Sequence, residues 1–522
     1  PIIPKMAVEL SLVLTPKQAA DPNLHTTLVA QRLHIDPARI ALLRIIRRSI
    51  DARGRSVKVN LGFEVYVDGE QRPPEIRFDY PDVSGRTPVV VVGSGPAGLF
   101  AALRLIELGF KPIVLERGRD VSTRKRDIAQ INRNGAVDPN SNYAFGEGGA
   151  GTYSDGKLFT RSKKRGDYRR ALEVFRFHGA DESILYDAHP HIGTDRLPRI
   201  IAAMRESIMA AGGEVIFEAQ VSGVEIRDEQ IRGVWLGDTL AEGAAVILAT
   251  GHSARDIYEL LDRDGVRLEA KAFAMGVRVE HPQQLIDSIQ YHMPERGEYL
   301  PAAAYSLVAQ VNGRGVYSFC MCPGGFIVPA MTRAGESVVN GMSPSGRNSV
   351  FANSGIVTEI RQEDFAHLTE QYGALAGLRF QQQLEELAYA QVEDRQVAPG
   401  QRLADFVRGK ASKSLPRCSY VPGVVPTEAH RWLPGFISDA LRGGFAAFDR
   451  KMHGFVTNEA LIVGVESRTS SPVRIPRDPD TLMHPQIRGL FPAGEGAGYA
   501  GGIISAAMDG ERCAERVADY VK

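Results

Sequence analysis

The segment PVVVVGSGPAG, residues 88–98, decides the fold. Its first five residues are apolar and mostly β-branched, which predicts a buried parallel strand. The chain breaks at Gly93 and continues from Leu99 as an amphipathic helix. A second apolar strand, residues 113–115, follows and ends at Glu116. Strand, helix and strand in this order make a complete βαβ unit.

Each glycine of this turn has its own physical role. Gly93 permits the tight turn, Gly95 lets the backbone approach a pyrophosphate, and Gly98 lets the helix pack on the strand. The helix N-terminus adds free N–H groups for an anion. Glu116 stands 23 residues after Gly93, where an acid can bind the ribose hydroxyls of adenosine. A Gly-rich sequence alone is often only a turn, but the whole unit predicts a nucleotide-binding fold.

Composition narrows the class of protein. The 522 residues are enough for two to four domains of about 150 residues each. Lys and Arg number 62, as do Asp and Glu, so overall charge favours neither nucleic acid nor a membrane as partner. Four cysteines do not make a disulfide framework, which favours a reducing, cytoplasmic setting. No apolar run approaches the ~18 residues of a membrane span, and residues 6–14 alternate like a strand rather than a signal peptide.

Residues 1–86 predict a small, separate α+β domain. After the strand at 6–14 comes a helix at about 25–33. The period of residues 39–49 fits helix or strand; strand is favoured because residues 57–67 alternate without a break as its partner. Pro73-Pro74 and the stretch from Pro81 to Thr87 then form a linker.

Basic residues gather at 32–58 in this domain, eight of them against Asp36 and Asp51. They could bind RNA or another acidic partner. The alternative is a solvated sheet face or an interface with the main body, and it is the favoured interpretation.

The nucleotide fold is not completed locally. Residues 145–157 carry five glycines, which suits backbone passing close to a flat ligand, with the Thr152 and Ser154 hydroxyls as donors; a flexible surface loop is the alternative. A buried strand from residue 245 ends at Thr250-Gly251, where ligands sit in a parallel sheet.

The rest of the chain contains further elements of the nucleotide fold, then an inserted segment, and finally the last part of the nucleotide fold. We predict helices at 168–178 and 197–211 and strands at 214–217 and 221–226. The inserted segment has predicted strands at 274–279, 305–311 and 316–321 and a helical region at 364–391. A strand at 489–496 and a C-terminal helix opening at 501–510 complete the nucleotide fold. The predicted domains are 1–86, 87–258 (first part of the nucleotide fold), 259–454 (an inserted α+β substrate domain) and 455–522 (the return). The fold class is α/β, with a Rossmann-like, mostly parallel sheet.

These motifs together carry a resemblance to a known family. They are GSGPAG with VLERG, SNYAFGEGGAGTYSDGKL, VILATGHSARD, FCMCPGG, VNGMSPSGRNSVFANSG, GVESRTSSPVRI and GLFPAGEGAGYAGGIISAAMDG. The chain resembles FAD-dependent flavoproteins with a glutathione-reductase-like fold, and most of all the bacterial FAD-dependent (NAD(FAD)-utilizing) dehydrogenases.

The resemblance implies FAD as cofactor and a set of residues that hold it. The glycines of the first turn would bind the pyrophosphate and Glu116 the ribose. Glu495 stands where relatives usually have Asp near the ribityl chain. The N–H groups of Gly502 and Ile503 would face the flavin N1–C2=O edge. The full set is Gly93, Gly95, Pro96, Ala97, Gly98, Glu116, Arg117, Arg124, Gly149, Gly151, Thr152, Ser154, Gly156, Val221, Thr250, Gly251, Gly494, Glu495, Gly502 and Ile503.

Two features depart from the disulfide-reductase pattern. There is no second GxGxxG and no CxxC beside the nucleotide motif. NAD(P)H would therefore be a transient co-substrate bound over the ring, or another reductant replaces it. No spacing of residues predicts a metal site.

Candidate catalytic residues each have a plainer alternative. His252 follows a functional strand end and could act as acid or base, or merely pack. Arg468 and Arg474 could clamp an anionic substrate or form structural salt bridges. Tyr499 could cover the flavin ring or simply pack. His189 and His191 are candidates of the same kind, with ordinary loop contacts favoured.

Cys320 and Cys322 share a face if they lie on a regular strand, which suggests a redox pair. Their Cα atoms would then lie ~6.5 Å apart, near the limit of disulfide geometry. Buried core residues are the favoured interpretation.

The sequence thus predicts an FAD-dependent oxidoreductase that transfers a hydride through flavin N5 to or from a small substrate. Two alternatives remain open: a flavoprotein that acts on RNA through its basic N-terminal domain, and a flavin-binding protein without turnover.

Overall fold

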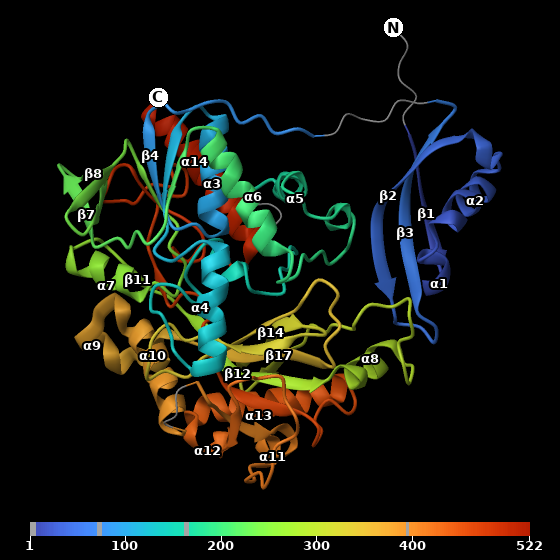
Figure 1. The fold of residues 1–522 in the computed structure, drawn as a ribbon. Coiled ribbons are helices and arrows are strands. Elements are labelled where there is room, and N and C mark those ends of the chain that lie inside the picture. Colours follow the sequence, from blue (N-terminus) through green and yellow to red (C-terminus); the bar gives the residue numbers. More distant parts are fainter. Residues whose placement is uncertain (1–6, 70–75, 161–165, 393–395) are drawn as a thin grey trace.

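A computed structural model describes residues 7–69, 76–160, 166–392 and 396–522. Figure 1 shows a small N-terminal domain set apart on one side and a larger body built on two sheets. In that view the nucleotide-type sheet lies in the upper part of the body and the second sheet below it.

The upper sheet has five strands in the order β22-β10-β4-β5-β6, and every neighbouring pair is parallel. Their bounds are Pro88–Val92 (β4), Lys111–Leu115 (β5), Glu214–Ile216 (β6), Val246–Leu248 (β10) and Leu490–Pro492 (β22). The four valines of β4 are buried, which confirms the predicted strand. Strands from both ends of the chain therefore meet in one sheet, as the sequence predicted.

Helices cover one face of this sheet. They are α3 (Pro96–Glu107), α5 (Tyr168–Phe177), α6 (Leu197–Ala210) and α14 (Ile503–Val521), and they share one apolar core with the sheet. The other face carries α7 (Arg255–Arg263) and a small antiparallel sheet of β7 (Gly223–Arg227), β8 (Gln230–Leu236) and β9 (Thr239–Glu242). The loop after β5 leads into α4 (Val121–Asn134).

The second sheet has seven strands in the order β13-β14-β17-β12-β20-β18-β19. Their bounds are Val308–Val311 (β13), Arg314–Cys322 (β14), Phe351–Ile360 (β17), Phe273–Pro282 (β12), Leu461–Glu466 (β20), Ala398–Arg402 (β18) and Val424–Pro426 (β19). Packed with it are α8 (Gln283–Tyr291), α10 (Ala376–Ala390), α11 (Leu403–Arg408), α12 (Ala429–Trp432) and α13 (Gly435–Lys451). Two-residue strands β11 (Glu269–Ala270) and β21 (Val473–Arg474) pair separately, as do β15 (Phe326–Pro329) and β16 (Val339–Met342).

One predicted boundary needs correction. Strand β20 lies inside the segment 455–522 that was predicted to return to the nucleotide fold, yet it pairs with β12 and β18 of the second sheet. The second domain therefore extends beyond residue 454, through Glu466. The predicted helical region 364–391 is also broken: α9 (Thr369–Tyr372) ends at Gly373, whose φ of 52° interrupts the helix before α10.

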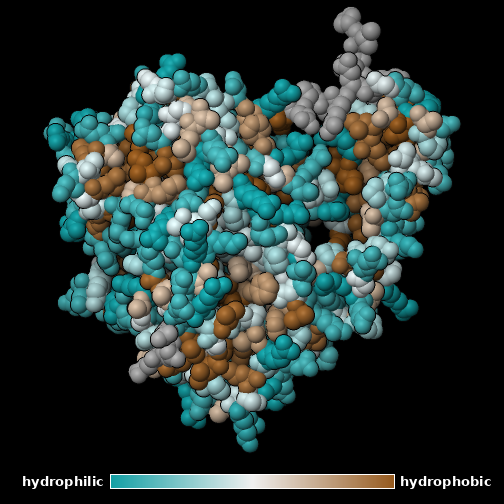
Figure 2. Space-filling view, viewed as in Figure 1, coloured by the Kyte–Doolittle hydropathy of each residue, from teal (hydrophilic) through white to brown (hydrophobic). Residues whose placement is uncertain are grey.

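The N-terminal domain contains β1 (Val8–Leu14), α1 (Pro16–Ala19), α2 (Pro22–Leu33), β2 (Ile40–Asp51) and β3 (Lys58–Val67), with sheet order β1-β3-β2. The ambiguous segment 39–49 is thus a strand, as favoured. The predicted Pro73-Pro74 part of the linker lies outside the described residues. Figure 2 shows the visible face hollowed between this domain and the body. None of the described helices is both long and apolar enough to cross a membrane.

Candidate functional site

Three glycine-containing segments distant in sequence meet at one place beside the parallel sheet. A Cβ added at Gly149 would lie 3.0 Å from the Cα of Gly95 in the first turn. A Cβ at Gly151 would lie 3.2 Å from Ile503, the first residue of α14, and 3.6 Å from Pro96. The structure therefore brings together the first turn, the Gly-rich loop and the start of the C-terminal helix, as the sequence predicted.

The helices that begin here leave their first N–H groups without side-chain caps. The N-caps are Gly95 for α3 and Gly502 for α14, and neither position has a side chain to accept a hydrogen bond. Ser or Asp stands at most such positions because its oxygen stabilises the helix start. Two uncapped N-termini beside one loop suit an anionic or electron-rich ligand.

Close backbone packing fixes the two helices against each other. A Cβ at Gly510 of α14 would lie 2.0 Å from the carbonyl oxygen of Ala97 in α3, and one at Gly98 would lie 1.8 Å from that of Gly93. A Cβ at Gly494 would lie 2.9 Å from the Cβ of Ala97. Gly510 and Gly98 are therefore required by contact between backbones, which confirms the packing role of Gly98, and Gly494 is required by its contact with the Ala97 side chain.

The residues that follow β10 pack against Gly93 in the turn after β4. Gly93 has a φ of 103°, and a Cβ there would lie 2.3 Å from the Ala249 carbonyl oxygen and 3.3 Å from the Cα of Thr250. A Cβ added at Gly496 would lie 2.7–2.9 Å from the backbone O, C and N atoms of Gly251. The Thr250-Gly251 strand end thus lies beside Gly93 and the C-terminal motif.

Glu116 holds the loops at this edge of the sheet together. Its carboxylate accepts hydrogen bonds from the Ser94 N–H and hydroxyl (3.0 and 2.7 Å), from the Gly118 N–H (2.9 Å) and from the Gly146 N–H (3.0 Å). The side chain is buried. Binding of the adenosine ribose by Glu116 stays a prediction.

Arg124 does not face a ligand, contrary to its predicted cofactor contact. The side chain is fully buried in α4, and its guanidinium donates to the carbonyl oxygens of Asn142, Tyr143, Gly146, Glu147 and Gly149. These carbonyls belong to the Gly-rich segment. Arg124 therefore shapes the loop from behind.

The hydroxyls of the Gly-rich loop also differ from expectation. The Thr152 hydroxyl donates to the Glu147 carbonyl (2.9 Å) and the Ser154 hydroxyl to the Gly151 carbonyl (2.7 Å). Both hydroxyl protons are donated to carbonyls of the loop itself, so the expectation that these hydroxyls donate to a ligand is wrong. Gly156 has a φ of 69° and packs against Leu197.

Arg117 and Val221 are two further predicted cofactor contacts. Arg117 donates to Asp256 and Asn140, and its guanidinium stacks 4.3 Å from the Phe145 ring centroid. Its charge is therefore partnered within the protein. Val221 is buried just before β7, outside the strand that was predicted to include it.

His252 and Glu495 face each other at the site. His252 Nε2 lies 3.5 Å from Glu495 Oε2, and the side chains are 12% and 31% exposed. Burial, with the charges of Arg468 and Arg255, lowers the pKa of His252 to about 4, and burial raises the pKa of Glu495. His252 is therefore neutral near pH 7 and suited to hydrogen bonding.

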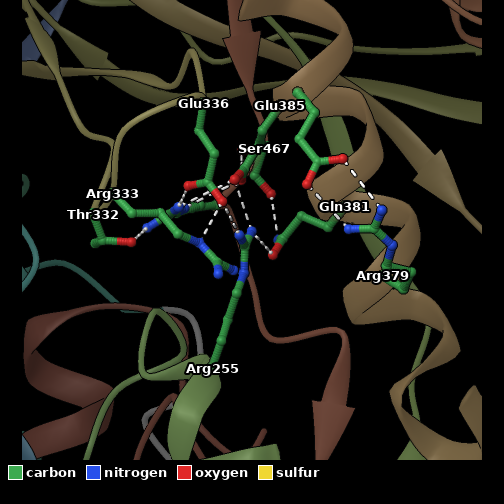
Figure 3. A network of polar contacts seen from close by, with 10 residues as sticks. Arg255, Thr332, Arg333, Glu336, Arg379, Gln381, Glu385 and Ser467 are labelled. Carbon is green, nitrogen blue, oxygen red and sulfur yellow. Dashed lines mark hydrogen bonds and ion pairs between the residues drawn. The ribbon is translucent and has the colours of Figure 1, made fainter. Parts of the chain in front are cut away.

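Arg468 belongs to a buried ionic network, so its predicted role as a substrate clamp is wrong and the salt-bridge alternative is correct. It donates to Glu336 and Glu385 at 3.0 and 3.1 Å, and Arg255 pairs with the same two carboxylates. Figure 3 shows Arg255 reaching from α7 toward Glu336 and the α10 residue Glu385. The network joins the nucleotide-type domain to the second domain.

Tyr499 packs between two arginines. Its hydroxyl accepts a hydrogen bond from the Arg477 N–H at 3.0 Å, and the guanidinium carbons of Arg477 and Arg474 lie 3.9 and 5.6 Å from its ring centroid. Arg477 also pairs with Asp509 at 2.6 Å. Tyr499 therefore packs against protein side chains, and a contact of its ring with the flavin stays a prediction.

Cys320 and Cys322 do not share a regular strand face. The register of β14 shifts between Phe319 and Cys322, and Cys320 has a φ of 44°. The Cys322 thiol donates to the Cys320 carbonyl. Cys322 is buried whereas Cys320 is exposed, so the interpretation as buried core residues is correct for Cys322 and wrong for Cys320. Burial raises the pKa of the Cys322 thiol, which is therefore not a thiolate near pH 7.

The remaining histidine candidates have local partners. His191 bonds through Nε2 to the Ser345 carbonyl at 3.1 Å, and His189 packs edge-on against Phe159. Sequence reasoning missed Arg278 and Glu466, a fully buried pair at 2.8 Å in the second domain. Their only sequence signal was a charge inside an apolar strand.

The residues present fit a flavin cofactor. Cβ atoms added at Gly251, Gly501 and Gly502 would meet no protein atom within 4 Å, so open space adjoins these glycines. The buried Nδ1 of His252 has no hydrogen-bond partner within the described parts of the chain. An orphaned polar atom beside open backbone and two helix N-termini is the arrangement that a bound dinucleotide would complete.

Three segments of the chain match known protein families, and one relative matches nearly the whole chain. Residues 88–363 match the family "FAD dependent oxidoreductase", residues 272–469 match "FAD-dependent protein, C-terminal domain-like", and residues 6–66 match a domain of unknown function. A protein of Clostridium beijerinckii, named only as uncharacterized, is 40% identical over 519 residues, covering 95% of this chain and 96% of its own.

Solved structures are similar at much lower identity. The flavin-dependent brominase Bmp2 is 12% identical with a TM-score of 0.37, over 83% of this chain and 79% of its own. A geranylgeranyl bacteriochlorophyll reductase-like protein of Thermoplasma acidophilum is 12% identical with a TM-score of 0.34, over 83% and 78%.

Proposed function

Because the chain belongs to the FAD-dependent oxidoreductase family, we propose that its FAD binds where Gly95, Gly149 and Gly502 converge and exchanges a hydride with a small substrate. Bound there, FAD supplies a carrier for two electrons between substrate and acceptor. The observation that carries the proposed location is the open space at Gly251, Gly501 and Gly502 beside two uncapped helix N-termini.

The chain's own residues would divide the work of binding. The N–H groups at the start of α3 would hold the pyrophosphate, with Glu116 and Val221 on the adenosine side. Those at the start of α14 would face the electron-rich edge of the flavin and favour its reduced form. Neutral His252 would donate or accept a hydrogen bond from its unpartnered Nδ1, and Glu495 would contact the ribityl chain.

The electron donor is proposed to be NAD(P)H or the substrate itself, in a cytoplasmic setting. The absence of a second GxGxxG in the sequence supports transient rather than dedicated nucleotide binding. The RNA alternative has little support, because Arg39, Arg44, Arg48 and Arg53 of the basic segment are already in ion pairs.

Substitution at Gly501 tests the location of the flavin. An added Cβ meets no protein atom there, and the position has no positive φ that would strain it. We expect Gly501→Val to leave the melting temperature of the apoprotein unchanged and to raise the Kd for FAD at least about tenfold, because the side chain would fill the flavin's space. Gly435→Val, at another open glycine at the start of α13, is the matched control.

Equal FAD affinity in both variants and wild type would place the flavin elsewhere. An anaerobic titration with NADH and then NADPH, followed by flavin absorbance, tests the donor. Bleaching at about one equivalent identifies a pyridine nucleotide as donor, whereas no bleaching assigns that role to the substrate. Purified protein that binds no FAD at all would overturn the proposal.

A further inference from the structure

Two cations without acidic partners lie beside the flavin motif. Lys271 follows β11 and Arg474 ends β21, and the two strands pair antiparallel. In Figure 1 β11 lies beside α7, where the two large sheets of the body meet. Over the described residues, no carboxylate oxygen is within the 4.0 Å of an ion pair from either side chain.

The hydrogen-bonding capacity of both side chains is largely unused. Among the described residues, Lys271 Nζ reaches only the carbonyls of Ala272 and Ser471, at 3.4 and 3.5 Å, near the limit of a hydrogen bond. Arg474 Nε is buried and has no hydrogen-bond partner in the described structure. A buried guanidinium donor left unpaired costs stability unless a ligand or water completes it.

The acidic residues nearby do not neutralise Lys271 and Arg474, because each pairs with another arginine. Glu269 is directly opposite Arg474 in register, but it pairs with Arg267 at 3.0 Å. Asp509 pairs with Arg477 at 2.6 Å. Burial, followed by the positive charge of Arg474, lowers the pKa of Lys271. Glu269 and Asp509 thus each have an arginine partner of their own.

Lys271 and Arg474 lie next to the C-terminal loop at which the flavin is proposed to bind. A Cβ added at Gly498, between Glu495 and Gly501, would lie 3.4 Å from Lys271 Cδ and 3.5 Å from the Arg474 Cα. The Lys271 charge also acts on His252, whose pKa it helps to lower. The guanidinium of Arg474 lies over Tyr499. The pair therefore borders the same C-terminal loop as the proposed flavin.

We infer that Lys271 and Arg474 bind an oxyanion, a phosphate or carboxylate, carried by a ligand of the flavin site. A planar guanidinium matches two oxygens of such a group, and an ammonium adds a mobile point charge. The inference deepens the proposed function, on which its placement beside a flavin rests. The anion has two possible sources: a phosphate of NAD(P)H, or a charged group of the substrate.

Inorganic phosphate is the probe for the site. Calorimetric titration of the FAD-loaded protein, at constant ionic strength kept with chloride, measures its Kd for wild type and for the double variant Lys271→Gln/Arg474→Gln. We expect the Kd to rise at least about tenfold in the double variant, because each charged hydrogen bond that is lost weakens binding. Arg263→Gln, an exposed arginine of α7 paired with Asp264, is the control and should bind like wild type.

A second experiment, flavin reduction by NADPH or NADH in the double variant, distinguishes the two possible sources of the anion. If the anion belongs to NAD(P)H, the half-saturating concentration of NADPH or NADH for flavin reduction rises in the double variant while the limiting rate is kept. If it belongs to the substrate, phosphate binding is lost but reduction by the nucleotides is unchanged. Either result, with FAD content and melting temperature unchanged, supports the site.

Absence of phosphate binding in wild type, or equal Kd values in wild type and the double variant, would overturn the inference. That failure differs from failure of the proposed function, which would appear as a protein that takes up no FAD. A protein that binds FAD but shows equal phosphate Kd values fails only the inference, so the two failures are distinguishable.

Discussion

Several polar side chains that look ligand-directed in the sequence are directed inward. Arg124, Thr152 and Ser154 all donate hydrogen bonds to the main chain of the Gly-rich segment. A loop with five glycines loses much backbone entropy when it is ordered. Side chains that bind its carbonyls offset that cost and hold the loop in its conformation.

Replacing Arg124 should release the loop. Arg124→Lys keeps the charge, but one ammonium cannot reach carbonyls spread from Asn142 to Gly149. We expect a loss of about 3 kcal/mol or more in the free energy of unfolding, because several buried carbonyls lose their hydrogen-bond donor, at about 1–3 kcal/mol each. FAD content after purification should fall as well. Thermal unfolding and the flavin-to-protein absorbance ratio measure the two effects.

Arg126→Lys is the matched control, since Arg126 is exposed on the same helix. It should keep both the melting temperature and the FAD content of wild type. If Arg124→Lys behaved like this control, the loop would be held by something other than the guanidinium.

A buried carboxyl in the second sheet predicts a pH dependence of stability. Glu280 of β12 is buried, accepts a hydrogen bond from the Ser419 N–H at 2.8 Å, and burial raises its pKa to about 7. The unfolded chain releases this proton near pH 4.5, the folded protein only near 7. The free energy of unfolding should therefore fall by up to about 3 kcal/mol as the pH rises through this window.

Glu280→Gln cannot titrate and should show a flatter dependence. Calorimetric melting temperatures between pH 5 and 8 should decline less steeply in this variant than in wild type, while the exposed control Glu242→Gln follows wild type. Parallel curves for wild type and Glu280→Gln would show that Glu280 is ionised throughout.

At the scale of elements, the contact between α3 and α14 sets the geometry of the cofactor site. The two helices start beside the same loop and touch through Gly510 and the backbone of Ala97. Both also belong to the largest apolar core of the nucleotide-type domain. Any separation of these helices would move the two N-termini that are proposed to bind FAD.

Gly510→Ala should therefore be destabilising although alanine favours helix. Its Cβ would lie 2.0 Å from the Ala97 carbonyl oxygen, so backbone must shift. We expect a loss of about 1–3 kcal/mol, as for overpacking, and weaker FAD binding. Unfolding in denaturant and FAD titration measure these. Gly435→Ala, in open space at the start of α13, should gain up to about 1 kcal/mol instead.

At the scale of the whole molecule, the N-terminal domain is docked by a hairpin. Arg48 of β2 pairs with Asp187 at 2.6 Å, and Val57, at the turn into β3, belongs to the apolar core of the second domain. Figure 1 shows this end of the domain approaching the body beside α8. The basic segment thus serves partly as an interface, in agreement with the alternative favoured over RNA binding.

Val57→Asp should undock the N-terminal domain without abolishing FAD binding. A buried carboxylate at this position cannot be paired, so the domain should separate from the body. We expect faster proteolysis between residues 76 and 87 at an unchanged FAD content. Val13→Asp, at a 67% exposed position of β1, should be cut at the wild-type rate. Equal rates for Val57→Asp and wild type would count against docking by the hairpin.

Sequence by itself determined the βαβ unit, the return of the chain to the parallel sheet and the N-terminal hairpin strands. These features are local: valines that alternate or run together, and glycines at fixed spacing, specify backbone conformation before any tertiary contact forms. The resemblance carried by the motifs likewise identified the FAD-dependent oxidoreductase family, which the family model matching residues 88–363 confirms.

Only the tertiary structure decided which charged residues are paired with each other. Arg468 and Arg474 stand six positions apart in one motif, yet Arg468 is neutralised by Glu336 and Glu385, whereas Arg474 meets Lys271. The same holds for β20, which joins the second sheet because its partners β12 and β18 lie there. Charge pairing and strand pairing depend on residues far away in the chain, and no local pattern specifies them.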